Sequence, residues 1–583
     1  MTTKVWRRRA SPASALLGVH PLLARLYAAR GVQSSDELAQ TLAALKPASA
    51  LQGLEAALDL LQRALREQWR LLIIGDFDAD GATSTALSVR ALRALGARHV
   101  DFLVPNRFTY GYGLTPGIVA LALAEKQPQL IITVDNGIAS HEGVIAAQAA
   151  GVRVLITDHH LPGPTLPPAD AIVNPNQPGC NFPSKNLAGV GVVFYVLSAL
   201  RTRLRAAGWF SEQGLTEPNM ADYLDLVALG TVADVVALDA NNRLLVQQGL
   251  ARIRAGRCCP GITALLKVAE RDPARLQATD LGFVVAPRLN AAGRLDDMAE
   301  GILCLLTDSP TAALRMAGEL DALNQERRDI EGGMQNEAMA ALNALKFTAD
   351  TLPHGLVLYD RHWHQGVIGI LAGRIKERYH RPVIAFAPAQ APAYGEQPAE
   401  LKGSARSIPG VHIRDVLDAV ATRYPGLISK FGGHAMAAGL SLPGASIATF
   451  REAFDEVLRD WMDEADLEAV LLTDGELAPA DFTETTARLL RDAGPWGQAF
   501  PEPLFEGEFL LLDQRLLKDK HLKLSLSHPD SNRIFDGIAF NIDRALWPNA
   551  ACKRVKLAYR LDLNFFRGME TLQLRIEDLQ ALS

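Results

Sequence analysis

Short apolar runs and longer helical patterns alternate in the first part of the chain. The runs RLLIIG, QLIITV and VRVLIT, at 70–75, 129–134 and 152–157, are rich in leucine and β-branched residues and have the length of buried strands. The segments at 82–96 and 140–151, which follow the first two runs, carry Ala, Leu and Val at helical spacing. Strands that alternate with helices predict βαβ units, and therefore a parallel sheet in an α/β fold.

Carboxylates and imidazoles stand directly after these predicted strands. The first strand leads into GDFDADG at 75–81, the second into Asp135, and the third into DHH at 158–160. The segment LDLVALGTVADVV, at 224–236, is interpreted as a further stretch of this kind and carries two more aspartates. The carboxyl ends of parallel strands lie along one edge of a sheet, which is where ligands bind. We therefore expect these side chains to meet in space.

The spacing of Asp76, Asp78 and Asp80 is also that of a calcium-binding EF-hand loop. An EF-hand needs a bidentate Glu at its twelfth position and a helix on each side. Here the twelfth residue is Leu87, and the loop joins a strand to a helix, so an EF-hand is excluded. Mixed carboxylate and imidazole ligands suit Mn²⁺ or Mg²⁺. Two such ions about 3.5–4 Å apart would clamp the attacking and leaving oxygens of a phosphoryl group, so the pattern predicts metal-dependent phosphoester hydrolysis.

The second half of the chain changes pattern twice. Residues 310–346 contain no proline after Pro310 and place apolar residues at helical spacing, which predicts a long connecting helix that Gly332–Gly333 is able to interrupt. Residues 466–583 contain short strands at fairly regular spacing with turn residues between them. This second pattern predicts a small β-barrel.

Composition limits the class of protein more than the function. The 583 residues predict several domains, and 48% apolar with 21% charged residues is typical of a globular protein in water. The net charge of −6 argues neither for nor against nucleic acid, because a local basic groove can coexist with clustered carboxylates. Five cysteines without CxxC spacing predict neither a disulfide framework nor a zinc site. No apolar run has the length of a signal or a membrane span, so we expect a cytoplasmic protein.

Four motifs resemble those of a known enzyme superfamily. DxDxDG at 76–81, VDNG at 134–137, DHH at 158–160 and GTVAD at 230–234 are similar to the signature motifs of the DHH phosphoesterase superfamily. The sequence between and after them, including PNRFTYGYGLTP, LAGVGVVFYVL and APRLNAAGRL, resembles the RecJ family, the 5′→3′ single-strand DNA exonucleases of bacteria. FGGHAMAAG, at 431–439, resembles the companion DHHA1 domain. The similarity extends over nearly the whole chain.

The resemblance implies an α/β fold of three main parts in a fixed order. A DHH parallel-sheet domain and a DHHA1 α/β domain are joined by a long helix, and a C-terminal OB-type β-barrel follows them. The expected boundaries are an N-terminal helical cap at 1–45, the DHH domain at 46–309, the connector helix at 310–350, the DHHA1 domain at 351–465 and an OB-fold nucleic-acid-binding domain at 466–583.

The resemblance also assigns roles around the metal ions. The residues expected to bind two Mn²⁺ or Mg²⁺ ions are Asp76, Asp78, Asp80, Asp135, His159 and Asp234. All of these except Asp76, together with His160, form the expected catalytic set. Asp135 is placed to bridge both ions, His160 to face the scissile phosphate, and Asp158 to orient the histidines. Asp225 is the alternative to Asp234, and a water with a lowered pKa is the expected nucleophile.

Substrate-binding residues are expected in both α/β domains. The candidates are Arg107, Arg288, Ser404, Arg406, Gly432, Gly433 and His434. Guanidinium groups suit bidentate phosphate recognition, and glycines let backbone N–H groups approach a phosphate closely. Arg294 is a further candidate, and His364 is expected either in the core or facing substrate. Four aromatic residues of the barrel are expected either to stack on bases or to pack in the barrel core, and the core is favoured for most of them. They are Phe535, Phe540, Trp547 and Tyr559.

The function that the resemblance implies is a single-stranded-DNA-specific 5′→3′ exonuclease that releases 5′-mononucleotides and acts in recombination and repair. A narrow channel between the two α/β domains is expected to exclude duplex DNA. A pocket near Arg107, Ser404 and Arg406 is expected to recognise the 5′ end. The expected partners are single-stranded DNA, a single-stranded-DNA-binding protein and a RecQ-type helicase, with no membrane and a monomeric chain.

Two other functions stay open. A small-molecule phosphoesterase of the same superfamily would act on pyrophosphate, cyclic dinucleotides or short oligonucleotides, although such a substrate does not need a barrel. A non-catalytic scaffold built on a decayed domain would bind DNA without cutting it. Decay would remove metal ligands, and every expected ligand is present in this sequence.

Overall fold

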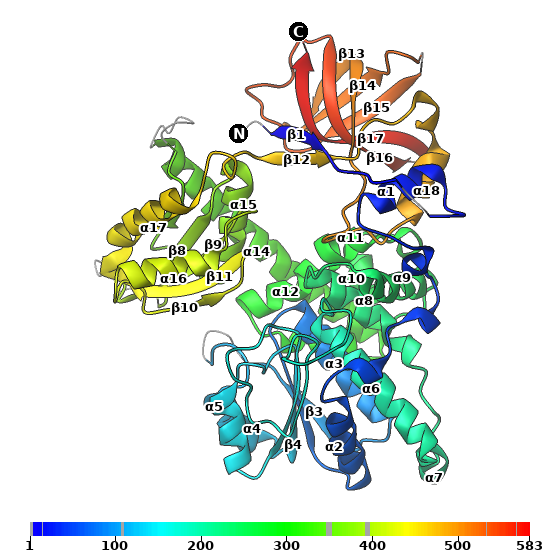
Figure 1. Cartoon of the computed structure of the whole chain (residues 1–583), viewed down its shortest axis with the longest axis vertical. Helices are drawn as coiled ribbons and strands as arrows, with labels where there is room; N and C mark the ends of the chain where they lie inside the picture. The colour runs from blue at the N-terminus through cyan, green and yellow to red at the C-terminus, as the bar shows by residue number, and fades with distance from the viewer. Residues whose placement is uncertain are drawn as a thin grey trace.

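The computed structural model describes residues 4–13, 16–105, 110–344, 352–390, 397–531, 533–566 and 568–582. Figure 1 shows three bodies joined into one molecule. A parallel-sheet domain with a helical layer lies at the bottom, a smaller α/β domain lies at the left, and a β-barrel lies at the top right. No helix in these ranges combines the length and the apolarity of a membrane span.

The first domain is built on a five-stranded parallel sheet with the order β3-β2-β4-β5-β6. The strands are β2 (Leu71–Gly75), β3 (Val100–Leu103), β4 (Leu130–Val134), β5 (Arg153–Thr157) and β6 (Ala171–Val173). Side chains of a strand point alternately to its two faces. Leu71 and Ile73 therefore enter a core shared with α2, α3 and α6, while Leu72 and Ile74 pack with α4 and α5. These helices are α2 (Leu54–Arg66), α3 (Ala79–Ala94), α4 (Pro116–Glu125), α5 (His141–Ala149) and α6 (Gly189–Ala206).

The segment 224–236 is a helix, so its interpretation as a fourth strand-like stretch was wrong. Helix α8 (Leu224–Ala233) is buried along nearly its whole length. An apolar run of this kind has no period that separates a buried strand from a buried helix. The same domain also contains α7 (Trp209–Gln213), α9 (Ala240–Arg254), α10 (Pro260–Val268), α11 (Ala278–Asp280), a π-helical turn at Leu281–Val285, α12 (Ala286–Leu295) and α13 (Ala299–Leu306).

The predicted connector is a single helix, α14 (Pro310–Ala344), which Gly332–Gly333 does not interrupt. Its first part contributes Ala317 and Leu320 to the core of the first domain. Its last turns contribute Met334 and Ala338 to a core of the second domain. The helix therefore belongs to both domains and fixes one against the other.

The second domain has a mixed sheet with the order β10-β11-β9-β8-β7. Its strands are β7 (Leu356–Tyr359), β8 (Val383–Pro388), β9 (Glu400–Arg406), β10 (Lys430–Gly433) and β11 (Ala437–Pro443). Only β7 and β8 are parallel, and the remaining pairs are antiparallel. The sheet packs against α15 (Ile368–Tyr379), α16 (Ile413–Arg423) and α17 (Ile447–Trp461). The glycine-rich segment forms the β10–β11 hairpin.

The C-terminal strands close into the predicted barrel. They are β13 (Phe505–Leu517), β14 (His521–Ser527), β15 (Ile534–Ala539), β16 (Arg554–Phe566) and β17 (Met569–Leu582), preceded by β12 (Val470–Thr473) and α18 (Glu484–Asp492). Phe535, Trp547 and Tyr559 are buried, as the core alternative predicted, whereas Phe540 is 54% exposed. The N-terminal segment holds α1 (Pro21–Ala28), but it also contains the strand β1 (Val5–Arg8), which the sequence did not predict. Strand β1 pairs with β12 in parallel.

Candidate metal centre

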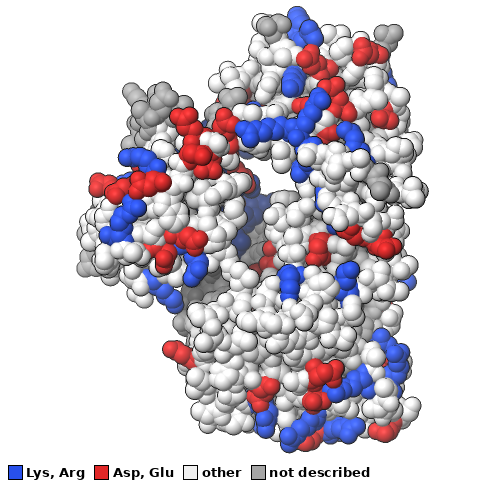
Figure 2. Space-filling model, in the orientation of Figure 1, with Lys and Arg blue, Asp and Glu red and all other residues white. Residues whose placement is uncertain are grey.

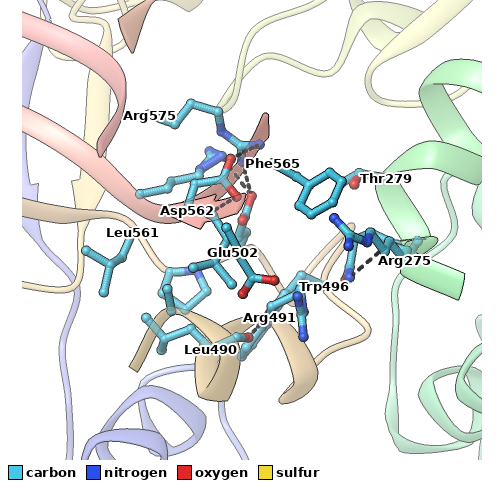
Figure 3. A pocket seen from close by; sticks show the side chains of 17 residues that line it. Arg275, Thr279, Leu490, Arg491, Trp496, Glu502, Leu561, Asp562, Phe565 and Arg575 are labelled. Atoms are coloured by element: carbon cyan, nitrogen blue, oxygen red, sulfur yellow. Dashed lines mark hydrogen bonds and ion pairs between the residues drawn. The ribbon is translucent and has the colours of Figure 1, made fainter. Parts of the chain in front are cut away.

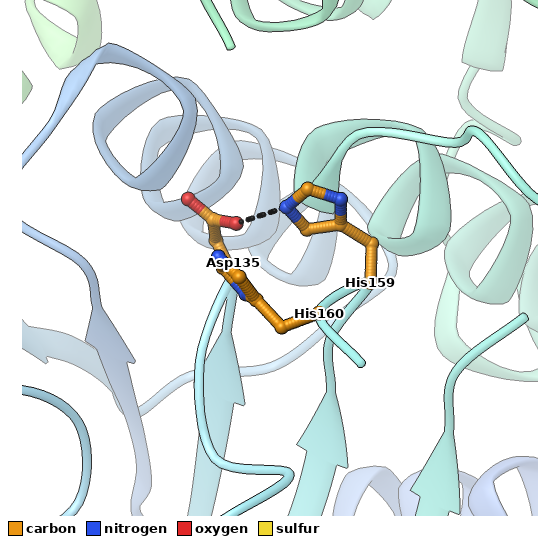
Figure 4. A group of neighbouring side chains, drawn as sticks. All are labelled: Asp135, His159 and His160. Carbon is orange, nitrogen blue, oxygen red and sulfur yellow. Dashed lines mark ion pairs between the residues drawn. The ribbon is translucent and has the colours of Figure 1, made fainter. Parts of the chain in front are cut away.

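The predicted carboxylates and imidazoles converge at the carboxyl edge of the first sheet. Figure 4 shows Asp135, just beyond β4, facing His159 and His160, just beyond β5. Within each of three groups the potential ligand atoms all lie within 4.8 Å of one another. The groups are Asp135, His159 and His160; Asp80, His159 and Asp234; and Asp76, Asp78 and Asp135.

The loop GDFDADG is shaped by the start of α3. The Asp78 carboxylate is the N-cap of this helix and accepts hydrogen bonds from the backbone N–H groups of Asp80, at 2.9 Å, and Gly81, at 3.0 Å. A Cβ at Gly81 would lie 2.4 Å from the carbonyl oxygen of Asp76, so only glycine fits there. The Oδ1 atom of Asn290, on α12, accepts the N–H of Ala79 at 2.7 Å. The acidic loop is thus held by the N-terminus of α3 and by the Asn290 side chain of α12.

Helix α6 supports the cluster with its N-terminus. The Asp80 carboxylate accepts the N–H groups of Gly189, at 2.6 Å, and Val190, at 3.0 Å, so it lies at the positive end of the helix dipole. Burial, followed by the charges of Asp234 and Asp78, nevertheless raises the pKa of Asp80 well above its ordinary value. A Cβ at Gly189 would lie 2.6 Å from Cβ of Asp135, and glycine there lets α6 approach this closely.

Asp135 combines three unusual properties. Its φ of +63° lies in the left-handed region, which costs energy for a residue other than glycine. Its side chain is buried, and its Oδ1 atom has no hydrogen-bond partner. Burial and the neighbouring carboxylates Asp80 and Asp78 raise its pKa well above the ordinary value.

A divalent cation fits this arrangement. Nε2 of His159 is buried and also lacks a hydrogen bond, although it lies 3.1 Å from Oδ1 of Asp135 and 3.5 Å from Oδ2 of Asp234. Burial lowers the pKa of His159, which favours the neutral imidazole that binds metals. Buried polar atoms without partners are costly. An ion between these groups would satisfy them and would offset the repulsion among the carboxylates.

The two candidates for the fourth-motif ligand stand at opposite ends of α8. Asp234 is the C-cap residue and joins Asp80 and His159 in one of the three groups. Asp225, in the first turn, is buried elsewhere and accepts the N–H groups of Leu226, at 2.8 Å, and Cys259, at 2.7 Å. The geometry therefore favours Asp234.

His160 is held by Asp158, as the sequence predicted. The Asp158 carboxylate accepts the backbone N–H groups of His159 and His160 and lies 2.8 Å from Nδ1 of His160. Burial opposes a charge on His160, but the hydrogen bond and charge of Asp158 outweigh it and raise the pKa to about 9. Burial alone would raise the pKa of Asp158, but the hydrogen bond to His160 and the charge of His160 lower this pKa below its ordinary value. In the absence of a bound ion, these shifts favour an imidazolium beside a carboxylate at neutral pH.

The sequence did not single out Tyr112, Asn290 or Gly189. The Tyr112 hydroxyl lies 3.4 Å from Nδ1 of His160 and from the backbone oxygen of Asp135. Burial, followed by the charges of Asp76 and Asp158, raises the pKa of Tyr112 well above its ordinary value. Tyr112 and Asn290 lie in the quoted segments PNRFTYGYGLTP and APRLNAAGRL, and this is the signal that would have found them.

The second domain brings its glycine-rich hairpin to the same place. The ring of His434 stacks on that of His160 with 6.3 Å between centroids. A Cβ at Gly432 would meet open space, so this backbone is accessible. On β9, Nη1 of Arg406 donates to Oγ of Ser404 at 3.1 Å, and burial lowers the pKa of Arg406.

The structure says less about three other residues that were candidates for contact with substrate. Arg107 lies outside the residues that the structure describes. Arg288 is buried and forms an ion pair with Asp321 at 2.8 Å, so its role toward substrate stays a prediction. Nδ1 of His364 accepts the N–H of Gly366 at 3.2 Å, and this turn packs on the backbone oxygen of Arg294, where the two α/β domains touch.

A separate pocket of about 200 Å³ lies between the first domain and the barrel, away from the metal centre (Figure 3). The guanidinium of Arg275 lies 3.5 Å above the ring of Phe565. Glu502 accepts from Arg560 at 3.2 Å and from Arg575 at 2.5 Å. The Arg275–Phe565 contact joins the two bodies, whereas Glu502 and its two arginines all lie in the barrel region.

Comparisons with known proteins cover nearly the whole chain. Family models match at residues 70–231 (DHH family, N-terminal domain), 353–460 (DHHA1 domain) and 473–578 (RecJ OB domain). The single-stranded-DNA-specific exonuclease RecJ of Escherichia coli is 57% identical over 96% of each chain, and that of Haemophilus influenzae is 50% identical over 99% of each. The crystal structure of RecJ from Thermus thermophilus in complex with Mn²⁺ superposes with a TM-score of 0.77 at 30% identity, covering 99% of this chain and 80% of that one. The chain therefore belongs to the RecJ family of single-stranded-DNA-specific exonucleases, hydrolases of the DHH phosphoesterase superfamily.

Proposed function

We propose that the protein degrades single-stranded DNA from its 5′ end and releases 5′-mononucleotides with the help of two divalent ions. One observation carries the proposal: two of the ligand groups share no residue, and a third overlaps both. Asp80, His159 and Asp234 form one group, while Asp76, Asp78 and Asp135 form the other. The third group contains Asp135 and His159, one residue from each. This arrangement suits two neighbouring ions, either Mn²⁺ or Mg²⁺, and Asp135 would help to hold both.

The residues around the ions have separate tasks in hydrolysis. When bound, two ions of this type lower the pKa of a bound water and neutralise charge on the phosphate. Asp78 and Asp135 hold their carboxylates in place through the α3 N-cap and the left-handed backbone. The His160 imidazolium, fixed by Asp158, presents a positive N–H group beside the cluster. It would stabilise the scissile phosphate or protonate the leaving oxygen.

The second domain would set polarity by gripping the terminal phosphate. Arg406 and Ser404 are already joined by a hydrogen bond, and the guanidinium is held in a partly buried position. The His434 ring faces His160 and offers an imidazole, and the neighbouring Gly432 and Gly433 would offer backbone N–H groups. With Arg107 from the first domain, they would form a pocket for the 5′ phosphate.

The rival functions are less well supported. A small-molecule phosphoesterase has no use for the barrel that packs on the first domain. A scaffold without activity would not keep two complete groups of ligands. In the cell we propose a cytoplasmic monomer that acts in recombination and repair, with a single-stranded-DNA-binding protein and a RecQ-type helicase as partners.

The decisive experiment uses single strands labelled at the 5′ or the 3′ end. The expected result with Mn²⁺ or Mg²⁺ is immediate release of the 5′ label as a mononucleotide, with gradual shortening of the 3′-labelled strand. EDTA should stop both, and a duplex of the same sequence should resist. Release of the 3′ label first, or hydrolysis in EDTA, would overturn the proposal.

A further inference from the structure

The helix that supports the metal loop contains an irregular turn. Residues 278–295 form one continuous helix, in which Leu281–Val285 have π-helical hydrogen bonds. A single π-helical turn inside an α-helix is rare and is often found at functional sites. Nη1 of Arg288 donates to the carbonyl of Val284 at 2.6 Å, and the same guanidinium pairs with Asp321 at 2.8 Å. The turn is therefore fastened to α14.

This π-helical turn exposes a large aromatic side chain. Leu281 and Val285 are buried in the core of the first domain, whereas Phe283, between them, is 78% exposed. No other phenylalanine in the described ranges is as exposed. A single exposed apolar side chain is common on protein surfaces and has no meaning by itself. Here, however, the exposed ring stands on an irregular turn that other residues hold in place, so the fold presents this ring to solvent in a fixed position.

The turn lies next to the metal centre. A Cβ at Gly282 would lie 3.2 Å from Cγ1 of Val232, on α8. Val232 precedes the metal-ligand candidate Asp234 by two residues, which is a rise of about 3 Å along a helix. Further along the helix that carries the turn, Asn290 bonds the acidic loop. Phe283 is therefore within reach of the first few nucleotides of a strand whose end is bound at the metal centre.

The surroundings of the turn suit a nucleic-acid strand. Figure 2 shows an opening between the three bodies with Lys and Arg side chains at its border, and α11 and α12, the two ends of the helix, lie below it in the same view (Figure 1). Arg271 and Arg328, whose charges act on Arg288, are both exposed. Arg271 pairs with Asp280 at 3.4 Å, whereas Arg328 forms no ion pair among the residues that the structure describes. Cations for phosphates and an aromatic face for bases are the usual means of binding single strands.

We infer that Phe283 is a stacking platform for one nucleobase of the strand that continues from the metal centre. The inference rests on the proposed exonuclease function. Every base has a π-face, so an aromatic ring holds a strand without selecting its sequence. The ring needs a base that is free on that face, which an unpaired strand offers. Phe283 would thus be a positioning residue that holds the strand while its end is at the metal centre.

The test measures binding under conditions that prevent cleavage. Every protein also carries Asp135→Asn, and fluorescence anisotropy follows binding of a 3′-labelled single strand in Mn²⁺. Phe283→Ala should weaken binding by about tenfold, and Phe283→Trp, which keeps an aromatic face, should restore it. Trp461→Ala, which removes another exposed aromatic side chain at the end of α17, is the matched control and should bind normally. The temperature of thermal unfolding should be the same in all of them, because both rings are exposed.

Abasic sites identify the base that stacks. Separate strands carry one abasic site at successive positions from the 5′ end. At one of these positions the abasic site should weaken binding when Phe283 is present but cause no further loss in Phe283→Ala, because both changes remove the same contact. Additive losses at every position, or unchanged binding by Phe283→Ala, would overturn the inference. Failure of the protein without Asp135→Asn to release a 5′ label would instead contradict the proposed function, on which these binding measurements do not depend.

Discussion

At the scale of a single residue, Asp135 shows most clearly how the folded chain forms a site for a metal ion. Its left-handed backbone, its buried side chain and its oxygen without a hydrogen bond each disfavour the folded state in the absence of an ion. A carboxyl whose pKa is raised by folding binds its proton more tightly in the folded chain. Without metal, stability therefore falls as the pH rises from the unfolded pKa of Asp135 to its higher folded pKa.

Replacing Asp135 by Asn should separate hydrolysis from binding. Asn tolerates the left-handed region but loses the charge that would bridge two ions. We expect kcat to fall at least about a thousandfold, equivalent to about 4 kcal/mol, while binding of single strands stays measurable by fluorescence anisotropy. In EDTA the variant should unfold at a higher urea concentration than the unmodified protein. Full activity with Mn²⁺ or Mg²⁺ would contradict the two-ion proposal.

Asp158 is the residue whose loss should reveal the charge on His160. Asp158→Asn removes half of a buried ion pair, which costs about 3 kcal/mol. Folding raises the pKa of His160 to about 9, so its contribution is complete below its unfolded pKa and disappears as the pH rises through the folded value. Urea unfolding in EDTA should therefore show a larger difference between variant and unmodified protein near pH 6 than near pH 10. An equal difference at both pH values would mean that His160 is neutral.

At the scale of elements, helix termini and helix faces hold the metal loop. The side chain of Asn290 on α12 accepts the first free N–H group of α3. Asn290→Ala should leave that N–H unpaired, tilt the Asp78 loop and weaken Mn²⁺ binding by about tenfold or more. Calorimetric titration of Mn²⁺ measures this directly. Asn186→Ala, an exposed asparagine that bonds Asp239 instead, is the matched control and should bind Mn²⁺ normally.

Helix α14 offers a test of rigidity. Gly332 and Gly333 lie in mid-helix, and a Cβ at either position would meet open space. Each Gly→Ala change should therefore stabilise the protein by about 1 kcal/mol, because alanine loses less conformational freedom in a helix. Thermal unfolding measures the gain. If the double variant is less active in spite of this gain, the glycines allow α14 to bend between the two α/β domains. Unchanged activity would mean that α14 is a rigid connection between them.

The sequence predicted elements whose signal is local and missed those that depend on distant contacts. The parallel sheet was predictable because its strands are short, buried and separated by helices. Helix α8 was not, because it is buried on every side and its apolar run carries no period. The convergence of Asp78, Asp135 and His159 follows from strand direction alone. The support that Asp80 receives from Gly189 joins residues 109 positions apart, and no local pattern records it.

At the scale of the whole molecule, the barrel is not a detachable tail. One continuous hydrophobic core runs from Ile73 in the first sheet to Tyr559 in the barrel. Arg30 from the N-terminal segment forms a buried bidentate pair with Asp474. Deleting residues 466–583 would expose this core, so lost activity in such a truncation would not isolate the contribution of the barrel. A test of the DNA path has to use the full chain.

Salt dependence provides that test. The chain carries a net charge of −6, so overall attraction to DNA is absent and binding must come from local contacts with phosphates. Each phosphate contact on a single strand contributes about −0.7 to the slope of log affinity against log salt. For the Asp135→Asn protein, a strand long enough to reach from the metal centre to the barrel should give a steeper slope than an oligonucleotide that fills only the metal centre. The difference counts the contacts beyond the centre, and equal slopes would show that the barrel adds none.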